Sequence, residues 1–516
     1  MTLNYRILVG LAGLSLTVTA CDSAEKNSSA KNEAGKKADD KGAKKDAQAD
    51  AKKADAKADA KVAAKVDAKA DANEDAAKAE AKAEEKPAEA KAEEKPVEAA
   101  KPAAALPEPG EAGPAYFAID DKGVFMLEGG SFSQVKKGPK KLVKQMAIGG
   151  DGKPYMLTYD GIMLLDGAAA KVVGKTSYKK TGSVDAFVVT PEGEIWTAGY
   201  KGIGHFVGKK WAVEDKKVLG DDVTLLQGVA VDTDGRVWVA SSNKLHFKEK
   251  DAAEWKDADL SKATERKPFF DGITVDPSGG LMATASSAVL KIEGPTAISP
   301  VELPSGVISS FGLLGYAPNG IGAIKTGVKT VARLEPGGGN TSYDRGDDFQ
   351  GTRVVALSAD GQGRLWVGSD IGVSVIGPGD ERATWLMGSV PEIAGKVKGI
   401  LVVGAGPELP EVGEQKKASE VTGTILLDGA PLADAAIEIC PEPSSLIKTS
   451  PCEDSPIRFA GTTDAAGKFS FADVPLGAYG VGVKAGEKWK ITFSGEYGAK
   501  MKEGKPFDIG KLKFKK

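Results

Sequence analysis

Histidine and cysteine are the residue types best suited to proton transfer, nucleophilic attack and metal binding. The chain of 516 residues holds two histidines and three cysteines. His205 and His246 stand nine residues after Trp196 and eight residues after Trp238, and each is followed by Phe. A position that repeats in this way indicates a packing role. We therefore predict no catalytic residue, no bound metal and no cofactor.

The first 20 residues are typical of an export signal. Arg6 supplies a positive start and residues 7–18 form an apolar core, which is too short and too early in the chain for a membrane-spanning helix. The segment Val18-Thr19-Ala20-Cys21 resembles the bacterial lipobox, in which the cysteine becomes the lipidated first residue of the mature protein. The resemblance implies that Cys21 carries a lipid anchor. An ordinary signal peptide, cleaved after Ala20, is the alternative.

The two remaining cysteines flank a loop rich in Pro and Ser. Cys440 and Cys452 lie close in the sequence, and cysteines so placed in an exported chain are expected to pair. A disulfide that closes a loop of this length stabilises a fold by roughly 3 kcal/mol. We predict a Cys440–Cys452 disulfide.

Two acidic runs, Asp232-x-Asp234-Gly235 and Asp120-Asp121-x-Gly123, resemble the start of a calcium loop. Calcium takes six or more oxygen ligands, and neither run continues with them. Asp-Gly turns between strands account for both runs better.

The longest polar insertion of the middle region is GGGNTSYDRGDDFQGTR, residues 337–353. Loops held by a rigid scaffold often carry function. We predict ligand or cation contacts at one mouth of the fold, with a polar surface loop that binds nothing as the alternative. The candidate residues are Asn340, Tyr343, Asp344, Arg345, Asp347 and Asp348.

Residues 21–112 predict a disordered tether. After Cys21 the segment is dominated by Ala, Lys, Asp and Glu, contains no aromatic residue and cannot bury a core. Like charges recur at i,i+4, as at Lys57/Lys61 and Asp55/Asp59, and would repel on a helix face. As a flexible coil the tether would span roughly 50 Å. A spacer is the simpler role, and binding of its Lys/Ala repeats to a cell-wall polymer or anionic lipid is the alternative.

Residues 113–406 contain an internal repeat. A Gly-x-x-aromatic/apolar step recurs, and its fourth positions are separated by 39, 41, 42, 44, 41 and 43 residues. These positions are Tyr116, Tyr155, Trp196, Trp238, Met282, Ala323 and Trp366. Each repeat alternates short apolar strands with Gly-containing turns, and four short strands in about forty residues is the size of one propeller blade.

The ends of the repeat region predict how the fold closes. The first repeat begins at its second strand, whereas an extra strand, VKGILVVGAG at 397–406, follows the seventh repeat. The extra strand can supply the missing inner strand of the first blade and so remove the open sheet edges. We predict a seven-bladed β-propeller closed by this C-terminal clasp strand.

The stretches VAVDTDGRVWVASS, VVTPEGEIWTAG and LSADGQGRLWVGSDIGVSVI resemble the propeller repeats of two-component-regulator ectodomains and of NHL and streptogramin-lyase-like propellers. The resemblance implies the architecture, because such propellers host enzymes, sensors and scaffolds alike.

A second module follows a polar linker at 407–419. Residues 420–516 contain VTGTILLDGAPLADAAIEIC and FAGTTDAAGKFSFADVPLGAYGVGVKA, whose alternating apolar residues predict half-buried strands. The pattern resembles the carboxypeptidase regulatory-like domain, a small transthyretin-like β-sandwich grouped with carbohydrate-binding-like folds. The resemblance implies a non-catalytic accessory.

These features predict an all-β lipoprotein of the bacterial cell envelope, extracytoplasmic and held at the periplasmic face or cell surface by its lipid. The near balance of 69 Lys and Arg against 72 Asp and Glu gives no support to nucleic-acid binding. We expect non-enzymatic binding or scaffolding of a protein or glycan, with a metal-dependent lyase or lactonase-like enzyme as the alternative. Binding is favoured because the expected inner strands are mainly apolar residues and Gly: 145–149, 186–190, 228–232, 272–276, 310–316, 354–358 and 397–404.

Overall fold

The computed structural model describes most of the chain after the tether. The described residues are 108–120, 122–139, 142–176, 181–264, 267–286, 288–303, 314–327, 329–336, 338–393, 396–444, 449–492 and 500–515. The predicted signal segment, Cys21 and nearly all of the predicted tether lie outside them. All described strands belong to one compact unit of the chain.

Strands and turns make up this part of the chain, which confirms the all-β prediction. Within the described ranges the helical segments are two short 3-10 turns, η1 (Lys216–Leu219) and η2 (Pro391–Ile393). None of the helices in these ranges has the length and hydropathy needed to cross a membrane.

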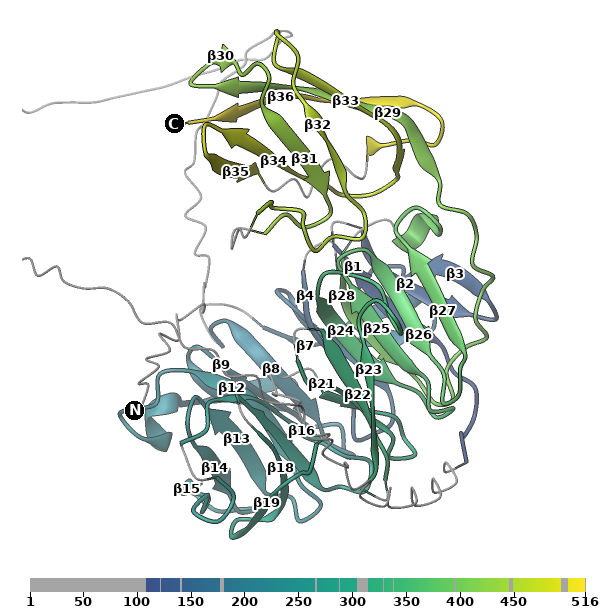
Figure 1. The fold of residues 1–516 in the computed structure, drawn as a ribbon. Coiled ribbons are helices and arrows are strands. Elements are labelled where there is room, and N and C mark those ends of the chain that lie inside the picture. Colours follow the sequence, from purple (N-terminus) through teal and green to yellow (C-terminus); the bar gives the residue numbers. More distant parts are fainter. Residues whose placement is uncertain are drawn as a thin grey trace, which may run out of the picture. The chain divides into compact units, whose positions relative to one another are not determined.

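The repeat region forms four-stranded antiparallel sheets, as expected for a β-propeller (Figure 1). The first sheet joins a late strand to three early ones, in the order β28 (Val397–Val402), β1 (Ala115–Ile119), β2 (Gly123–Glu128) and β3 (Ser131–Gln134). The next two are β4 (Val143–Ile148), β5 (Pro154–Thr158), β6 (Gly161–Asp166) and β7 (Ala169–Lys175), then β8 (Val184–Val189), β9 (Ile195–Gly199), β10 (Gly202–Val207) and β11 (Lys210–Asp215).

Four further sheets of the same order complete the repeat region. Two of them are β12 (Leu226–Val231), β13 (Val237–Ser241), β14 (Leu245–Lys248) and β15 (Lys256–Asp257), then β16 (Phe270–Val275), β17 (Leu281–Ala285), β18 (Ala288–Gly294) and β19 (Ala297–Pro300). The other two are β20 (Leu314–Tyr316), β21 (Gly322–Lys325), β22 (Thr330–Leu334) and β23 (Asn340–Asp344), then β24 (Val354–Ala359), β25 (Leu365–Ser369), β26 (Gly372–Ile376) and β27 (Arg382–Leu386).

The repeated Asp-x-x-Gly turns and aromatic residues are joined by one hydrogen-bond pattern. The indole of Trp238 donates to Asp232 over 2.9 Å, and that of Trp366 donates to Asp360 over 2.8 Å. Asp232 Oδ1 also accepts from the backbone N–H groups of Asp234 and Arg236, which closes the turn. The acidic run at Asp232 is therefore a strand turn, as the Asp-Gly interpretation predicted.

We call β4, β8, β12, β16, β20, β24 and β28 the inner strands, and most of them contact the inner strand of a neighbouring sheet. Contacts link β28 to β4, β4 to β8, β8 to β12, β12 to β16, β20 to β24 and β24 to β28. The side chain of Gln145 in β4 accepts a hydrogen bond from the N–H of Phe187 in β8 of the next sheet. Corresponding positions of these two inner strands therefore lie next to each other, and the two strands run in the same direction. A Cβ at Gly228 would lie 2.7 Å from the backbone nitrogen of Ile273, which explains why a glycine stands there.

The core of the repeat region lies between successive sheets. Trp238, Phe270 and Leu281 share one buried cluster, although they come from two sheets. Phe117 of β1 packs against Trp366 of β25 with ring centroids 6.0 Å apart. Burying side chains of this size contributes roughly 1.5–3 kcal/mol each.

The C-terminal residues form two more four-stranded sheets, green to yellow in Figure 1. One contains β30 (Ala430–Pro431), β29 (Lys417–Leu427), β33 (Lys468–Pro475) and β36 (Pro506–Phe514), which runs parallel to β29. The other contains β32 (Phe459–Thr462), β31 (Ala436–Cys440), β34 (Gly480–Ala485) and β35 (Lys488–Thr492). Ile425 and Phe469 of the first sheet share a buried cluster with Ile437 and Val481 of the second, so the two sheets enclose one core.

Candidate functional site

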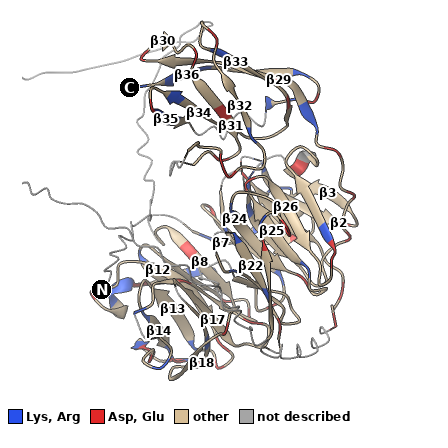
Figure 2. Ribbon diagram, viewed as in Figure 1, with Lys and Arg blue, Asp and Glu red and all other residues tan. Residues whose placement is uncertain are grey.

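Each of six inner strands leaves one residue unpaired near its beginning. The register with the neighbouring strand shifts there, for example between Phe270 and Gly272 in β16. We call the skipped positions the bulge residues, and five of the six carry polar or charged side chains; Figure 2 shows an acidic colour within β8. The bulge residues are Lys144, Asp185, Gln227, Asp271, Val355 and Lys398.

We call the end of the sheets at which the inner strands begin the strand-start face, and the opposite end, which carries the Asp-Gly turns, the hairpin face. Two bulge residues on the strand-start face pair with each other across neighbouring sheets. Lys144 donates to Asp185 over 2.8 Å and to the carbonyl of Val184 over 2.7 Å. Its ammonium group also lies 5.3 Å from the ring centre of Tyr159. Lys398 lies 3.5 Å from the carboxylate of Asp120.

Asp271 differs from Asp185 because it has no such partner. Its Oδ2 atom is buried and, within the part of the chain that the structure describes, accepts no hydrogen bond. Burial raises the pKa of Asp271 to about 6. The bulge residue of the preceding inner strand is the neutral Gln227, whereas Asp185 is preceded by Lys144.

Large apolar side chains are exposed on the same strand-start face. Tyr159 and Tyr200 occupy turns between second and third strands and are 58% and 59% exposed. Leu142, Leu225 and Phe269 are also exposed, and each stands directly before an inner strand. Exposed apolar residues that gather on one face are typical of an interaction surface.

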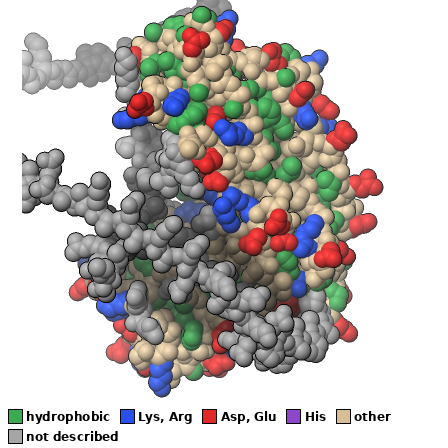
Figure 3. All heavy atoms as spheres, viewed as in Figure 1, with side chains coloured by type: hydrophobic (Ala, Val, Ile, Leu, Met, Phe, Trp, Pro, Cys, Tyr) green, Lys and Arg blue, Asp and Glu red, His purple; other side chains and the backbone are tan. Residues whose placement is uncertain are grey.

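Charged groups of both signs surround these apolar positions. Lys216 lies 5.0 Å from the ring centre of Tyr200, and Lys144 lies over Tyr159. On the part of the surface that Figure 3 shows, acidic and basic side chains are interspersed with hydrophobic ones. The surface therefore offers aromatic contacts and individual charges rather than one extended charged field.

Both histidines lie in third strands, away from the inner strands. His205 of β10 stacks on Trp196 with ring centroids 3.7 Å apart, and its Nε2 lies 3.1 Å from Glu194. His246 of β14 is fully buried. Burial lowers the pKa of His246, although the negative charge of Asp257 acts to raise it.

The surroundings of His246 have the connectivity of a nucleophile, base and acid. Its Nε2 lies 3.0 Å from Ser241 Oγ, and its Nδ1 lies 2.7 Å from Asp257 Oδ1. Ser241 is 1% exposed, and its hydroxyl also bonds to the carbonyl of Lys244, so a substrate does not reach it. The constellation links β13, β14 and β15, and its partners were not predicted from the sequence.

The polar insertion 337–353 is not the loop that was expected. Residues Asn340–Asp344 form β23, the outermost strand of its sheet. Tyr343 is buried, with the guanidinium carbons of Arg333 and Arg382 5.9 and 5.5 Å from its ring centre. The expectation of a mouth loop is therefore wrong for Asn340, Tyr343 and Asp344.

The remaining candidates of that insertion have local partners or are exposed. Asp348 forms an ion pair of 2.8 Å with Arg382 and accepts from the N–H of Asp344. Arg345 donates to the carbonyl of Thr352 over 2.8 Å, and Asp347 is exposed. Asn340 donates to the carbonyl of Glu302 over 3.0 Å. These contacts join the segment to neighbouring strands, and Arg345 also lies 3.7 Å from Asp454 of the C-terminal residues. A ligand-binding role for the segment stays a prediction.

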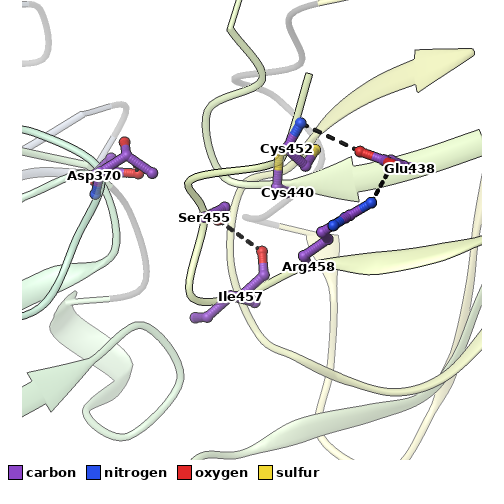
Figure 4. The surroundings of a disulfide bond; sticks show 8 residues. Asp370, Glu438, Cys440, Cys452, Ser455, Ile457 and Arg458 are labelled. Carbon is purple, nitrogen blue, oxygen red and sulfur yellow. Dashed lines mark hydrogen bonds and ion pairs between the residues drawn. A yellow bond between two sulfur atoms is a disulfide. The ribbon is translucent and has the colours of Figure 1, made fainter. Parts of the chain in front are cut away.

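The predicted disulfide is present between Cys440 and Cys452, with their Cα atoms 5.8 Å apart (Figure 4). Glu438 accepts from the N–H of Cys452 over 3.2 Å and also pairs with Arg458. The disulfide and this carboxylate together hold Cys452 against the end of β31.

The geometry defines an all-β protein whose repeat region is a β-propeller with an apolar and charged strand-start face. No family model and no curated protein matches the sequence. Among solved structures, virginiamycin B lyase from Staphylococcus aureus is similar at 13% identity and a TM-score of 0.39, over 54% of this chain and 88% of that one.

Two extracellular or surface proteins are also similar. The extracellular domain of a hybrid two-component system from B. thetaiotaomicron matches at 13% identity and a TM-score of 0.41, over 75% of this chain and 57% of that one. PorZ, a surface component of the type-IX secretion system of Porphyromonas gingivalis, matches at 11% identity and a TM-score of 0.37, over 72% of this chain and 55% of that one.

Proposed function

We propose that the protein is a lipid-anchored, non-enzymatic binding or scaffold protein of the bacterial cell envelope, and that it holds a protein partner on the strand-start face. The observation that carries the proposal is the exposure of Tyr159, Tyr200, Leu225 and Phe269 on one face of four consecutive sheets. Aromatic anchors among individual charged groups are typical of protein interfaces.

For the architecture, we infer seven blades in residues 113–406, closed by β28 as the clasp strand. The pairing of β28 with β1 and its contacts with β24 and β4 support this inference. For residues 420–516 we infer a carboxypeptidase regulatory-like sandwich after the linker at 407–419. The two sheets around one core support that assignment.

The lyase alternative requires histidine and acidic side chains on the inner strands. His205 and His246 instead lie in third strands, each beside a carboxylate of its own sheet. Asp185 and Asp271 are the acidic bulge residues, and Lys144 already neutralises the first. These placements favour binding over catalysis.

The anchored location rests on the lipobox-like segment that ends at Cys21. The described chain meets the propeller at the hairpin face, where the carbonyl of Glu108 accepts from Asn319 and that of Glu111 accepts from the N–H of Ala405. The tether thus joins the end of the propeller opposite to the strand-start face.

Site-specific photo-crosslinking in the host cell tests the proposed face. A benzophenone amino acid placed at Tyr159 or at Tyr200 should give one discrete adduct with a partner protein. The matched control is the same probe at Val213, an exposed apolar residue of the outermost strand β11. Absence of an adduct at the two tyrosines, or the same adduct at Val213, would contradict the proposal.

A further inference from the structure

One bulge residue, Lys144, reaches forward to the next sheet, and this gives the acidic bulge residue Asp185 a specific neighbour. Lys144 of β4 extends to the start of β8, where it donates to Ser183, Val184 and Asp185. The inner strands repeat the same register, so the equivalent neighbour of Asp271 in β16 is Gln227 of β12. The position equivalent to Lys144 thus holds a neutral amide, and among the described residues no ion pair is formed by Asp271.

A carboxylate buried without a cation or hydrogen-bond donor is costly. Among the described residues, the buried Oδ2 of Asp271 accepts no hydrogen bond. Burial raises the pKa of Asp271 to about 6, so the side chain is largely ionised at neutral pH. The fold therefore holds an uncompensated negative charge at the strand-start face. A ligand that brings a positive charge would remove this cost.

The surroundings of Asp271 indicate what carries that charge. Phe269 stands two residues before it and is exposed, and Leu225 occupies the equivalent position before β12 and is exposed too. An apolar surface beside a single carboxylate suits a basic side chain, whose aliphatic stem packs while its head group is paired.

We propose that Asp271 receives the guanidinium or ammonium group of a basic side chain on the protein partner, while Phe269 and Leu225 contact the apolar residues next to it. This proposal rests on the proposed binding role of the strand-start face and names the chemistry that the face recognises. A divalent cation fits less well, because calcium takes six or more oxygen ligands and the described residues contain no group of three or more His, Cys, Asp or Glu side chains placed to share one ion.

Calorimetric titration of the purified full-length chain with two matched peptides tests the proposal. The first is acetyl-Phe-Leu-Arg-Leu-Phe-amide, and the second carries citrulline, the neutral isostere of arginine, at the centre. The arginine peptide should bind at least roughly tenfold more tightly, as expected for a charge-assisted hydrogen bond. Asp271→Asn should abolish the preference, and so should Gln227→Lys, which supplies an internal cation.

The matched control is Asp276→Asn, at the other end of the same strand on the hairpin face. It should keep the preference for arginine. Equal affinity of the two peptides, no saturable binding of the arginine peptide, or a preference retained in Asp271→Asn would overturn the role of Asp271. If crosslinking at Tyr159 persists in Asp271→Asn, a protein partner still binds the strand-start face and only the role of Asp271 is excluded. The two proposals can therefore fail separately.

Discussion

At the scale of single residues, the bulge positions show how one backbone irregularity gives different chemistry in different sheets. Lys144 and Asp185 neutralise each other at a distance of 2.8 Å, and both charges are used within the fold. Gln227 leaves Asp271 unpaired at the same register. A neutral residue at one repeat thus replaces the cation of a structural ion pair, and within the described part of the chain the buried Oδ2 of the matching carboxylate accepts no hydrogen bond.

Replacing Asp271 with Asn should stabilise the protein at neutral and alkaline pH. The folded-state pKa of about 6 lies above the ordinary value of 3.8, so the folded state binds the proton more tightly than the unfolded state does. Wild-type stability from this group therefore rises as the pH falls from about 7 towards 4. The variant should exceed the wild type by about 3 kcal/mol at pH 8, and the difference should become small as the pH falls towards 4.

Urea unfolding from pH 4 to pH 8 measures this difference. Asp276→Asn is the control, because its carboxylate accepts hydrogen bonds from Ser278 and Gly280 within a turn. A stability difference between wild type and Asp271→Asn that does not change with pH would show that the carboxylate is not held in its buried, high-pKa state.

Four of the bulge residues were missed because the expected inner strands begin two residues after the observed ones. The expected ranges 145–149, 186–190, 228–232 and 272–276 each start directly after the bulge residue. Those residues disturb the apolar alternation that marks a strand, so the pattern placed them in turns. Their spacing of 41, 42 and 44 residues follows the period of the repeat and is the signal that could have found them.

At the scale of elements, the buried Asp360–Arg364 pair holds one turn rigidly. Asp360 is fully buried and accepts from the guanidinium of Arg364 and from the indole of Trp366. Arg364 also donates to the carbonyls of Ala405 and Pro407, which joins this turn to the chain after β28.

Asp360→Ala should therefore lower the free energy of unfolding by about 3–5 kcal/mol, because it leaves the buried guanidinium without its counter-charge. The matched control is Asp232→Ala in the equivalent turn, where Arg236 is more exposed and also pairs with Glu249. The control should cost roughly 1 kcal/mol. Chemical denaturation of both variants checks the difference, and equal losses would mean that burial of the pair is not what matters.

Repeat spacing and Asp-Gly turns predicted the sheets well, because the second and third strands of each sheet carry buried apolar residues. The outermost strands are less visible in the sequence. In β23 only Tyr343 is buried, and its neighbours are polar because they face solvent. A polar strand of this kind has the composition of a loop, which is why residues 337–353 were interpreted as one.

At the scale of the whole molecule, the proposed attachment of the protein to the membrane depends on the side chain of Cys21, which lies outside the described residues. Cys21→Ser should remove the acceptor of the lipid and move the protein from the membrane fraction to the soluble envelope fraction. A single acyl chain binds membranes only marginally, so the proposed anchor requires the full lipid modification of the cysteine. Immunoblotting of fractionated cells measures this, with Ser23→Ala as the control. A Cys21→Ser protein that still sediments with membranes would remove the anchor.

The inferred closure of the propeller depends on β28, which pairs with β1 although the two strands are far apart in the sequence. β28 pairs with β1 along its length, from Ala115 opposite Val402 to Ile119 opposite Val397. Ile400 and Leu401 are also buried between sheets. Deleting residues 397–402 would expose this core and leave β1 as an unpaired edge.

The deletion should cost about 6 kcal/mol or more, given roughly 1.5–3 kcal/mol for each buried apolar side chain, and should lower Tm sharply or abolish the cooperative transition of the repeat region. Differential scanning calorimetry of the full-length protein measures this. A deletion of equal length in the tether, residues 57–62, is the control and should leave Tm unchanged. If both deletions melt like the wild type, β28 does not close the propeller, because removing a closing strand must expose the edge of β1 and the apolar core beside it.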